Sequence, residues 1–370
     1  MTTTRPLFLA ELAAATLLLA FTFATAVRAD DTPRFAVDPY WPKPLPKNWI
    51  LGQVGGIAVG PDDHIWVLQR PRTLTDDERG AVVVPPTAKC CAPAPSVLEF
   101  DADGNLLQAW GGPGEGYEWP ENEHGISIDP DGNVWVAGNG KSDHQVLKFT
   151  RDGKFLLQIG RAGQTGDSNS TTLLGRPALP LLDAQAGELY IADGYKNRRV
   201  VVFDAATGKY KRHWGAYGKT PDDQDAGPYD PDAPIAKQYR TPVHCVRIAR
   251  DGLVYVCDRV NNRYQVFQKD GAFVSEIILE PRTRFVGSVW DIGFSEDTAQ
   301  KYLYVADGTN SEIHILLRKT GETLASFGRS GRQNGQFHWL HTMAVDSKGN
   351  IYTGEVDTGK RIQKFKKVKD

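Results

Sequence analysis

The chain has 370 residues and nearly balanced charge, with 43 lysines and arginines against 45 aspartates and glutamates. This balance excludes a strongly basic protein, so we expect neither a nucleic-acid partner nor attraction to anionic lipid. The length would suit two domains, although closed β architectures commonly use this length as one domain.

The first 29 residues have the features of a secretory signal peptide. Arg5 precedes an apolar stretch that begins at Leu12, and small residues follow up to Ala29. Cleavage is expected after Ala29, at the end of the motif VRA. Glu11 is unusual in such a start, so an uncleaved anchor is the alternative, although this apolar stretch barely spans a bilayer. We therefore predict a signal peptide over residues 1–29 and a periplasmic or secreted protein with no further membrane contact.

Beyond residue 50 one two-strand phrase recurs six times. Each copy opens with a short apolar strand, turns at Asp-Gly or a similar pair, and continues into a second strand that ends in a polar loop. A third strand and usually a fourth follow, as in residues 145–160 and 198–215. The six copies are residues 55–70, 124–139, 178–194, 244–259, 290–308 and 341–356.

The repeats predict an all-β fold. Period-two alternation and enrichment in β-branched and aromatic residues favour strands, and nothing after the signal has the pattern of a long amphipathic helix. Six four-stranded sheets at this spacing predict one six-bladed β-propeller over residues 30–370, with a solenoid or two small sandwiches as the alternatives. The sixth copy ends after its third strand, so we expect residues 32–42 to supply its outer strand and close the ring.

Histidines occupy one register position in alternate copies. The start of the innermost strand carries Gly55, His124, Ala178, His244, Trp290 and His341. Alternate blades of a six-fold ring are related by about 120°, so these three imidazoles should converge on the axis. Three neutral imidazoles with an open fourth position are typical of a catalytic zinc site. Such a site would also suit another divalent transition metal. For any one histidine alone, satisfying a backbone group at the strand entrance is the alternative.

A second register position lies at the end of the second strand and should form the rim of the same mouth. Arg70 and Arg259 occupy it in the first and fourth copies, and Tyr195 follows it by one residue in the third. Arginine binds carboxylates in a bidentate manner and tyrosine can transfer a proton, so we expect a small polar or anionic substrate. Surface or inter-blade ion pairs are the alternative for each arginine.

Several phrases resemble a known family. The stretches HGISIDPDGNVWV, GELYIADGYKNRRVVVF, VHCVRIARDGLVYVCDRVNNRYQVF and LHTMAVDSKGNIYTGEV resemble NHL-repeat propellers, most closely the lyase domain of peptidylglycine α-amidating enzyme. The resemblance covers nearly the whole chain after the signal.

The resemblance implies a carbon–nitrogen lyase that opens a carbinolamide to an amide and glyoxylate. It implies a zinc ion held by His124, His244 and His341, and it matches Arg70, Arg259 and Tyr195 to catalytic residues. Zinc would polarise or deprotonate the α-hydroxyl, and Tyr195 would act as the general base beside arginine charge.

The sequence departs from the family pattern in three places. Thr342 follows the third histidine where the family has an aspartate associated with calcium, so we do not expect the family's calcium site in this chain. The loop over residues 137–143 differs, and residues 71–95 form a long insertion on the active-site side, which we expect to act as a lid. These differences leave the peptide substrate open.

The four cysteines fall into two pairs. Cys90 and Cys91 are adjacent within the insertion, where they would form a vicinal disulfide or remain two exposed thiols. Cys245 and Cys257 flank the turn of the fourth copy, where a cross-strand disulfide or simple apolar packing is expected.

Two functional classes remain alternatives to the lyase. A non-catalytic propeller would use the same rim to bind a protein or glycan ligand, since the fold hosts both kinds of function. A lactonase-like propeller would require carboxylate and amide ligands for calcium in the channel, and histidines in alternate copies disfavour it.

Overall fold

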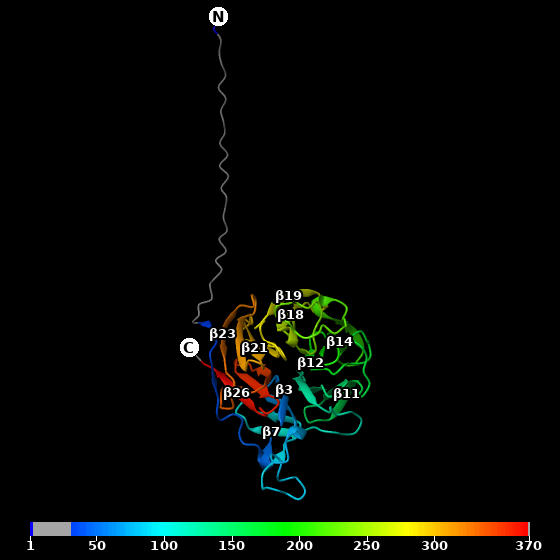
Figure 1. The fold of residues 1–370 in the computed structure, drawn as a ribbon, viewed down its shortest axis with the longest axis vertical. Helices are drawn as coiled ribbons and strands as arrows, with labels where there is room; N and C mark the ends of the chain where they lie inside the picture. The colour runs from blue at the N-terminus through cyan, green and yellow to red at the C-terminus, as the bar shows by residue number, and fades with distance from the viewer. Residues whose placement is uncertain (3–30, 369–370) are drawn as a thin grey trace. The chain divides into compact units, whose positions relative to one another are not determined.

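The structure, a computed structural model, describes residues 1–2 and 31–368, so all but the first two residues of the expected signal peptide lie outside the described residues. Residues 33–368 form the predicted β-propeller, with six four-stranded antiparallel sheets around a central axis (Figure 1). Within the described residues, no helix is both long enough and apolar enough to cross a membrane.

The first three blades follow one another directly in the chain, each running from its innermost strand outward. Blade 1 contains β3 (Gln53–Val59), β4 (Ile65–Arg70), β6 (Val97–Phe100) and β7 (Leu106–Trp110). Blade 2 contains β8 (Glu123–Ile128), β9 (Val134–Gly138), β10 (Gln145–Phe149) and β11 (Phe155–Gly160). Blade 3 contains β12 (Leu179–Asp183), β13 (Glu188–Asp193), β14 (Arg199–Asp204) and β15 (Tyr210–Trp214).

The last three blades continue this order, except that the final outer strand comes from the N-terminal side. Blade 4 contains β16 (Val243–Ile248), β17 (Val254–Asp258), β18 (Arg263–Phe267) and β19 (Phe273–Ile278). Blade 5 contains β20 (Asp291–Phe294), β21 (Tyr302–Asp307), β22 (Glu312–Leu317) and β23 (Thr323–Phe327). Blade 6 contains β24 (Leu340–Val345), β25 (Ile351–Glu355), β26 (Ile362–Lys367) and β1 (Phe35–Val37).

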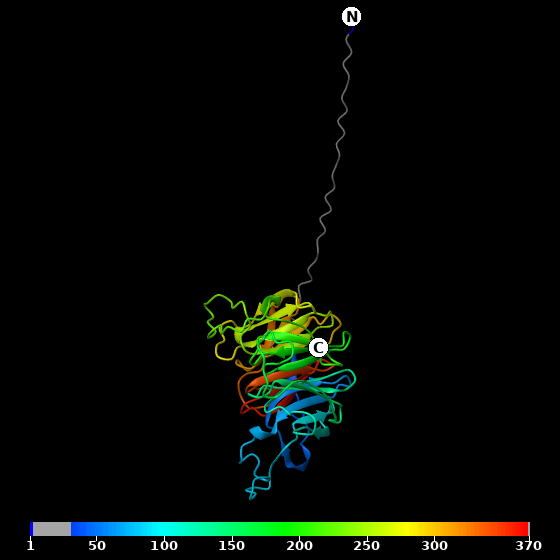
Figure 2. The ribbon, with the colours of Figure 1, turned by 90° about the vertical axis from the view of Figure 1, so that its right-hand side faces the viewer.

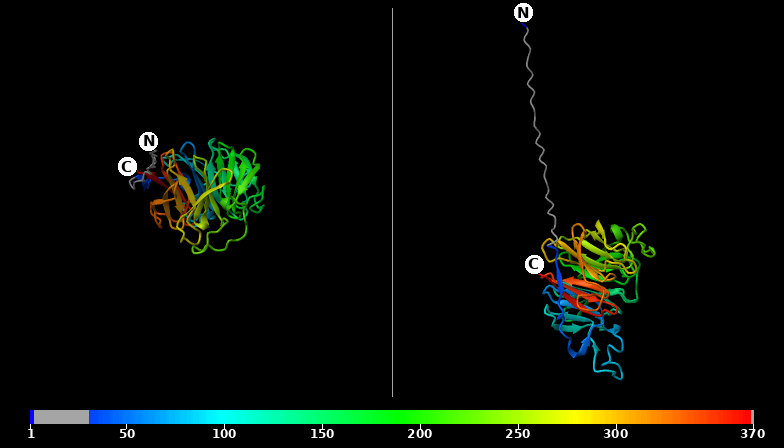
Figure 3. Two further views of the ribbon diagram at one scale, coloured as in Figure 1. Left: turned by 90° about the horizontal axis from the view of Figure 1, so that it is seen from above. Right: turned by 60° about the vertical axis from the view of Figure 1, so that its left-hand side comes forward.

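Blade 6 closes the ring as predicted. The N-terminal strand β1 pairs antiparallel with β26, with Phe35 opposite Lys367 and Val37 opposite Phe365. Figure 3 shows this blue strand beside the red C-terminal strands. The closing strand removes the free edge that β26 would otherwise present and joins the two ends of the chain in one blade.

The insertion between β4 and β6 does not form the expected lid. Its base carries the short helix η3 (Pro71–Thr73) and the strand β5 (Ala92–Pro93), which pairs in parallel with β2 (Trp49–Ile50) after the short helix η2 (Pro46–Asn48). Its tip is exposed and projects outward beyond blade 1, away from the channel axis, in both views (Figures 1 and 2). The β2–β5 pairing fixes the base at the edge of blade 1, so the loop leaves the mouth uncovered.

Both cysteine pairs are joined. Cys90 and Cys91 form a vicinal disulfide in the exposed insertion, and Cys245 faces Cys257 across β16 and β17 in a second disulfide. Two disulfides are compatible with an extracellular location, since oxidising compartments preserve them.

Two further short helices lie in loops on the rim side of the blades: η4 (Ala216–Gly218) and η5 (Arg259–Asn261). The core fills the spaces between adjacent sheets, where Trp66 of blade 1 and Trp135 of blade 2 are almost fully buried. Packing of each blade against its neighbours fixes where the inner strands point.

Phe35→Ala should weaken the closing contact between β1 and blade 5. The Phe35 ring stacks on Phe327 at 5.1 Å and meets Tyr304 edge-on at 5.5 Å. Loss of a half-buried aromatic side chain in such a cluster destabilises by about 1–3 kcal/mol. Chemical denaturation measures the change, and Ala36→Ser, at the exposed neighbouring position, is the control. Equal stability of the two variants would contradict the closing role.

Thiol titration tests the two disulfides directly. Protein unfolded without reductant should show no free thiol, because all four cysteines are paired. After reduction the same preparation should show all four. Two thiols in the unreduced sample, located by peptide mapping at Cys90 and Cys91, would disprove the vicinal bond.

Candidate functional site

The three histidines lie at irregularities in the innermost strands. Pairing of β16 with β17 skips His244, pairing of β24 with β25 skips His341, and pairing of β8 with β9 is shifted at His124. A β-bulge leaves one residue outside the ladder and redirects its side chain. Gly55 is skipped in the same way in blade 1, whereas blades 3 and 5 begin their inner strands one residue later. The bulges therefore let the histidines leave the blades and face the axis.

The three imidazoles meet on the axis as predicted. Their ring centroids are 4.6 Å apart for His124 and His341, and 4.9 Å apart for the two pairs that include His244. One nitrogen from each ring lies within 4.8 Å of the others, and all three side chains are buried. This near-equilateral arrangement can hold one metal ion.

Backbone carbonyls of the blades that lack histidine orient two of the rings. The Nδ1 of His124 lies 2.9 Å from the carbonyl oxygen of Ala178, and the Nδ1 of His244 lies 2.6 Å from that of Trp290. Donation by Nδ1 leaves Nε2 with its lone pair, as in metal-binding histidines. The Nε2 of His244 and the Nδ1 of His341 are buried with no hydrogen-bond partner. Buried nitrogens without partners fit a metal that would accept their lone pairs.

The imidazoles are neutral. Burial, reinforced by the charges of Arg70 and Arg259, holds the pKa of all three histidines well below its usual range. Neutral imidazole is the form that binds a metal, so the site needs no proton release to accept one.

Tyr195 and Arg259 reach the same mouth from two similar turns. The Tyr195 hydroxyl lies 2.8 Å from the Nε2 of His124, and the Nη1 of Arg259 lies 3.4 Å from that hydroxyl. The turn at Tyr195 is braced by a buried ion pair of Asp193 with Arg199.

The turn at Arg259 has the matching pair, formed by Asp258 and Arg263. The DGYKNRR and DRVNNR phrases therefore form rigid turns. These turns present Tyr195, two residues after Asp193, and Arg259, directly after Asp258, to the axis.

Neither rim arginine is neutralised by a carboxylate. Arg70 donates from Nε to the carbonyl oxygen of Glu123 at 2.6 Å and from Nη1 to Gln53 at 2.8 Å, so it braces blade 1 against blade 2 without an ion pair. Arg259 lies over the Trp290 ring at 4.3 Å, and burial lowers the pKa of both arginines. No ion pair joins either guanidinium to a carboxylate of the described residues. Two buried positive charges without counter-ions favour an anionic ligand.

Arg176 is a rim residue that the sequence reasoning missed. Its guanidinium carbon lies 5.9 Å from the centre of the Tyr195 ring, and its Nη2 donates to the carbonyl oxygen of Asn139 at 2.6 Å. It precedes the register position Ala178 by two residues, and this short distance from the register is the one sequence signal that could have pointed to it. Arg176 and Arg259 thus both lie 5.9 Å from the centre of the Tyr195 ring.

A second cluster of metal-ligand types occurs in blade 1 but is occupied by an arginine. Asp62, His64 and Glu99 lie together, and Arg151 inserts among them, with Nη1 2.8 Å from Asp62 and Nη2 2.7 Å from the Nδ1 of His64. Arg151 also pairs with Glu99. The guanidinium satisfies this cluster as an ion-pair network on the surface.

Comparisons with known proteins agree with this architecture. Peptidyl-glycine alpha-amidating monooxygenase B of Xenopus laevis is 26% identical over 327 residues, which cover 86% of this chain and 34% of that protein. NHL repeat-containing protein 3 of Mus musculus is 26% identical over 364 residues, covering 93% of this chain and 87% of that protein. A probable peptidyl-alpha-hydroxyglycine alpha-amidating lyase of Caenorhabditis elegans is 23% identical over 331 residues, covering 85% and 82%. No protein-family model matches the chain.

The chain is therefore an NHL-type six-bladed propeller that resembles the amidating lyases. It spans about a third of the length of the amphibian monooxygenase that it matches. The similarity supports an enzyme of lyase type, and the buried histidine triad can hold a metal.

His244→Ala should abolish stoichiometric metal binding. The substitution removes one of three ligands, and a divalent transition metal held by two imidazoles alone is bound far more weakly. Elemental analysis of the purified protein gives the ratio of metal to chain. His213→Ala is the matched control, because His213 lies on β15 in contact with Tyr210. Retention of one metal per chain in His244→Ala would exclude this site.

Proposed function

We propose that the protein is an exported zinc-dependent lyase that cleaves the carbon–nitrogen bond of a carbinolamide bearing a carboxylate, of the peptidyl-α-hydroxyglycine type. The products are an amide and glyoxylate. The observation that carries the proposal is the convergence of three buried neutral imidazoles with a phenol and two guanidiniums that lack carboxylate partners. The similarity to the amidating lyases supports the same reaction type.

Substrate binding rests on the uncompensated arginines. Arg70 and Arg259 lie on the rim, held by carbonyl, amide and aromatic contacts that leave their charge unneutralised. A carboxylate beside the reacting carbon would supply the missing counter-charge and form charge-assisted hydrogen bonds. The rim thus selects a small anionic head group and places its neighbouring hydroxyl near the axis.

Tyr195 is positioned to move the proton. Its hydroxyl lies at the histidine mouth with Arg259 beside it, and the positive charge of Arg259 stabilises the oxygen once its proton has left. As general base, the deprotonated oxygen of Tyr195 takes the proton of the substrate hydroxyl, the carbon–oxygen double bond forms, and the carbon–nitrogen bond breaks. The proton then passes to the amide nitrogen, so the reaction needs no water and no oxidant.

His124, His244 and His341 would hold the zinc ion. When bound, the ion would act as a Lewis acid that polarises the substrate hydroxyl and eases its deprotonation. The carbonyls of Ala178 and Trp290 keep two of the rings in the required orientation.

A propeller that binds a ligand without chemistry is the second candidate. The mouse NHL repeat-containing protein 3 matches over nearly all of both chains, and its name specifies repeats and no reaction. Stoichiometric zinc in the purified protein discriminates the two, because a binding surface does not require it.

Tyr195→Phe should retain the metal and lower turnover of a peptidyl-α-hydroxyglycine by about 10²- to 10⁴-fold, the usual contribution of a general base. The phenol is not among the expected ligands, so metal content should stay at the native ratio. Release of glyoxylate from a synthetic substrate measures the rate. Tyr210→Phe, which removes a hydroxyl bonded to His213 on the outer strand of blade 3, is the control.

Arg70→Ala separates binding from proton transfer. It removes a charge from the rim, so it should chiefly raise KM, whereas Tyr195→Phe should chiefly lower kcat. Native turnover by Tyr195→Phe would remove Tyr195 from the mechanism. Zinc-loaded protein with no lyase activity would redirect the search to another substrate.

A further inference from the structure

A second layer of residues lies directly beneath the histidines. The residue that follows each register position forms this layer: Gly56, Gly125, Leu179, Cys245, Asp291 and Thr342. The residues of this layer and those of the histidine register line one small cavity on the axis. Trp290 is the one residue of the histidine register that does not line this cavity. Among the six residues of the second layer only Asp291 carries a charge, and it is 4% exposed.

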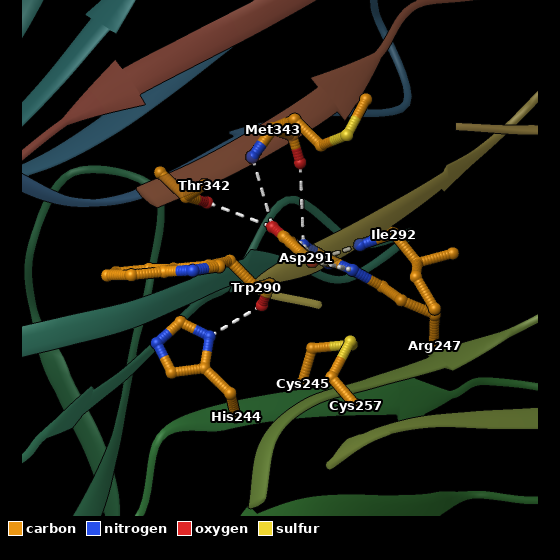
Figure 4. The surroundings of a disulfide bond; sticks show 9 residues. All are labelled: His244, Cys245, Arg247, Cys257, Trp290, Asp291, Ile292, Thr342 and Met343. Carbon is orange, nitrogen blue, oxygen red and sulfur yellow. Dashed lines mark hydrogen bonds and ion pairs between the residues drawn. A yellow bond between two sulfur atoms is a disulfide. The ribbon is translucent and has the colours of Figure 1, made fainter. Parts of the chain in front are cut away.

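Six hydrogen bonds converge on the Asp291 carboxylate (Figure 4). The guanidinium of Arg247, from β16, contacts both carboxylate oxygens, with Nη2 2.7 Å from Oδ2 and Nε 3.0 Å from Oδ1. The hydroxyl of Thr342 and the backbone N–H of Met343 donate to Oδ2 at 3.1 and 3.0 Å. The N–H of Ile292 donates to Oδ1 at 2.8 Å. One carboxylate therefore joins blades 4, 5 and 6.

This junction adjoins two of the three imidazoles. Asp291 follows Trp290, whose carbonyl oxygen holds the Nδ1 of His244, and Figure 4 shows this contact beside the carboxylate. Thr342 follows His341 in the chain. A shift of the carboxylate would therefore move the carbonyl that orients His244 and the strand that carries His341.

Arg247 is the one cation paired with Asp291 among the described residues. A buried carboxylate requires a counter-charge, and removal of its partner leaves an uncompensated charge in a poorly solvated place. The nearby Arg250 does not share this role, because its guanidinium donates to the carbonyl oxygens of Glu296 and Asp297.

We propose that Arg247 is a positioning residue, the internal counter-cation that fixes Asp291 and through it the orientation of His244 and His341. The guanidinium neutralises the carboxylate beneath the triad, so Asp291 needs no metal cation as its partner. The effect on metal affinity rests on the proposed zinc site, whereas the effect on the stability of the metal-free protein does not.

The experiment compares Arg247→Met, the double variant Arg247→Met/Asp291→Asn, and Arg250→Met as the matched control. In metal-free protein, Arg247→Met should lower Tm by roughly 5–15 °C, because Asp291 stays buried and unpaired. The double variant should recover much of that loss, since asparagine removes the charge. Arg250→Met should keep the native Tm within about 2 °C.

Metal affinity gives the readout that a purely structural arginine would not change. Competition with a chromophoric chelator should show zinc affinity reduced by about 10- to 100-fold in Arg247→Met, as for other groups that orient ligands, and unchanged in Arg250→Met. If Arg247→Met does not fold, recovery of folded protein in the double variant supports the counter-cation role.

Three results would overturn the proposal: a double variant no more stable than Arg247→Met, a double variant that also fails to fold, or native zinc affinity in a folded Arg247→Met. Wild-type protein that binds no zinc would refute the proposed function, and the comparison of Tm values would still decide the role of Arg247.

Discussion

The candidate site depends on a local break in the β ladder at the start of the innermost strands. A regular strand sends its side chains alternately to the two faces of its own sheet, where the neighbouring blades cover them. The bulges release His124, His244 and His341 from this alternation and turn them to the axis. Because the fold repeats, the same break in alternate blades produces a triangular set of ligands.

The rest of the mouth is organised around charges that the protein leaves uncompensated. Arg70 and Arg259 are buried without a carboxylate partner, while Arg199 and Arg263, close in sequence to the rim turns, are paired with aspartates. The paired arginines stiffen the turns, and the unpaired ones remain available to a ligand. Because these two guanidiniums are buried and poorly solvated, binding an anion would stabilise their positive charge.

Guanidiniums lie on both sides of the histidines, and they differ in their partners. The rim guanidiniums face the open mouth, whereas Arg247 forms an ion pair with Asp291 on the other side of the triad. Arg247 and Asp291 thus belong to the scaffold, whereas Arg70 and Arg259 have no carboxylate partner among the described residues.

The sequence by itself determined the number of blades, the closing strand and the common register of the histidines, whereas it left open whether Cys245 and Cys257 are bonded or only packed together. Each of these follows from period-two alternation or from the spacing of the repeats, which are local properties of the chain. Tertiary structure alone decided the partners of Arg70, the presence of Arg176 beside Tyr195 and the pairing of Arg247 with Asp291. These contacts join different blades, and no local pattern reports which atoms of separate sheets meet. The prediction that residues 71–95 form a lid over the mouth was wrong. The β2–β5 pairing at the edge of blade 1 fixes where the loop extends, whereas its point of insertion in the sequence does not.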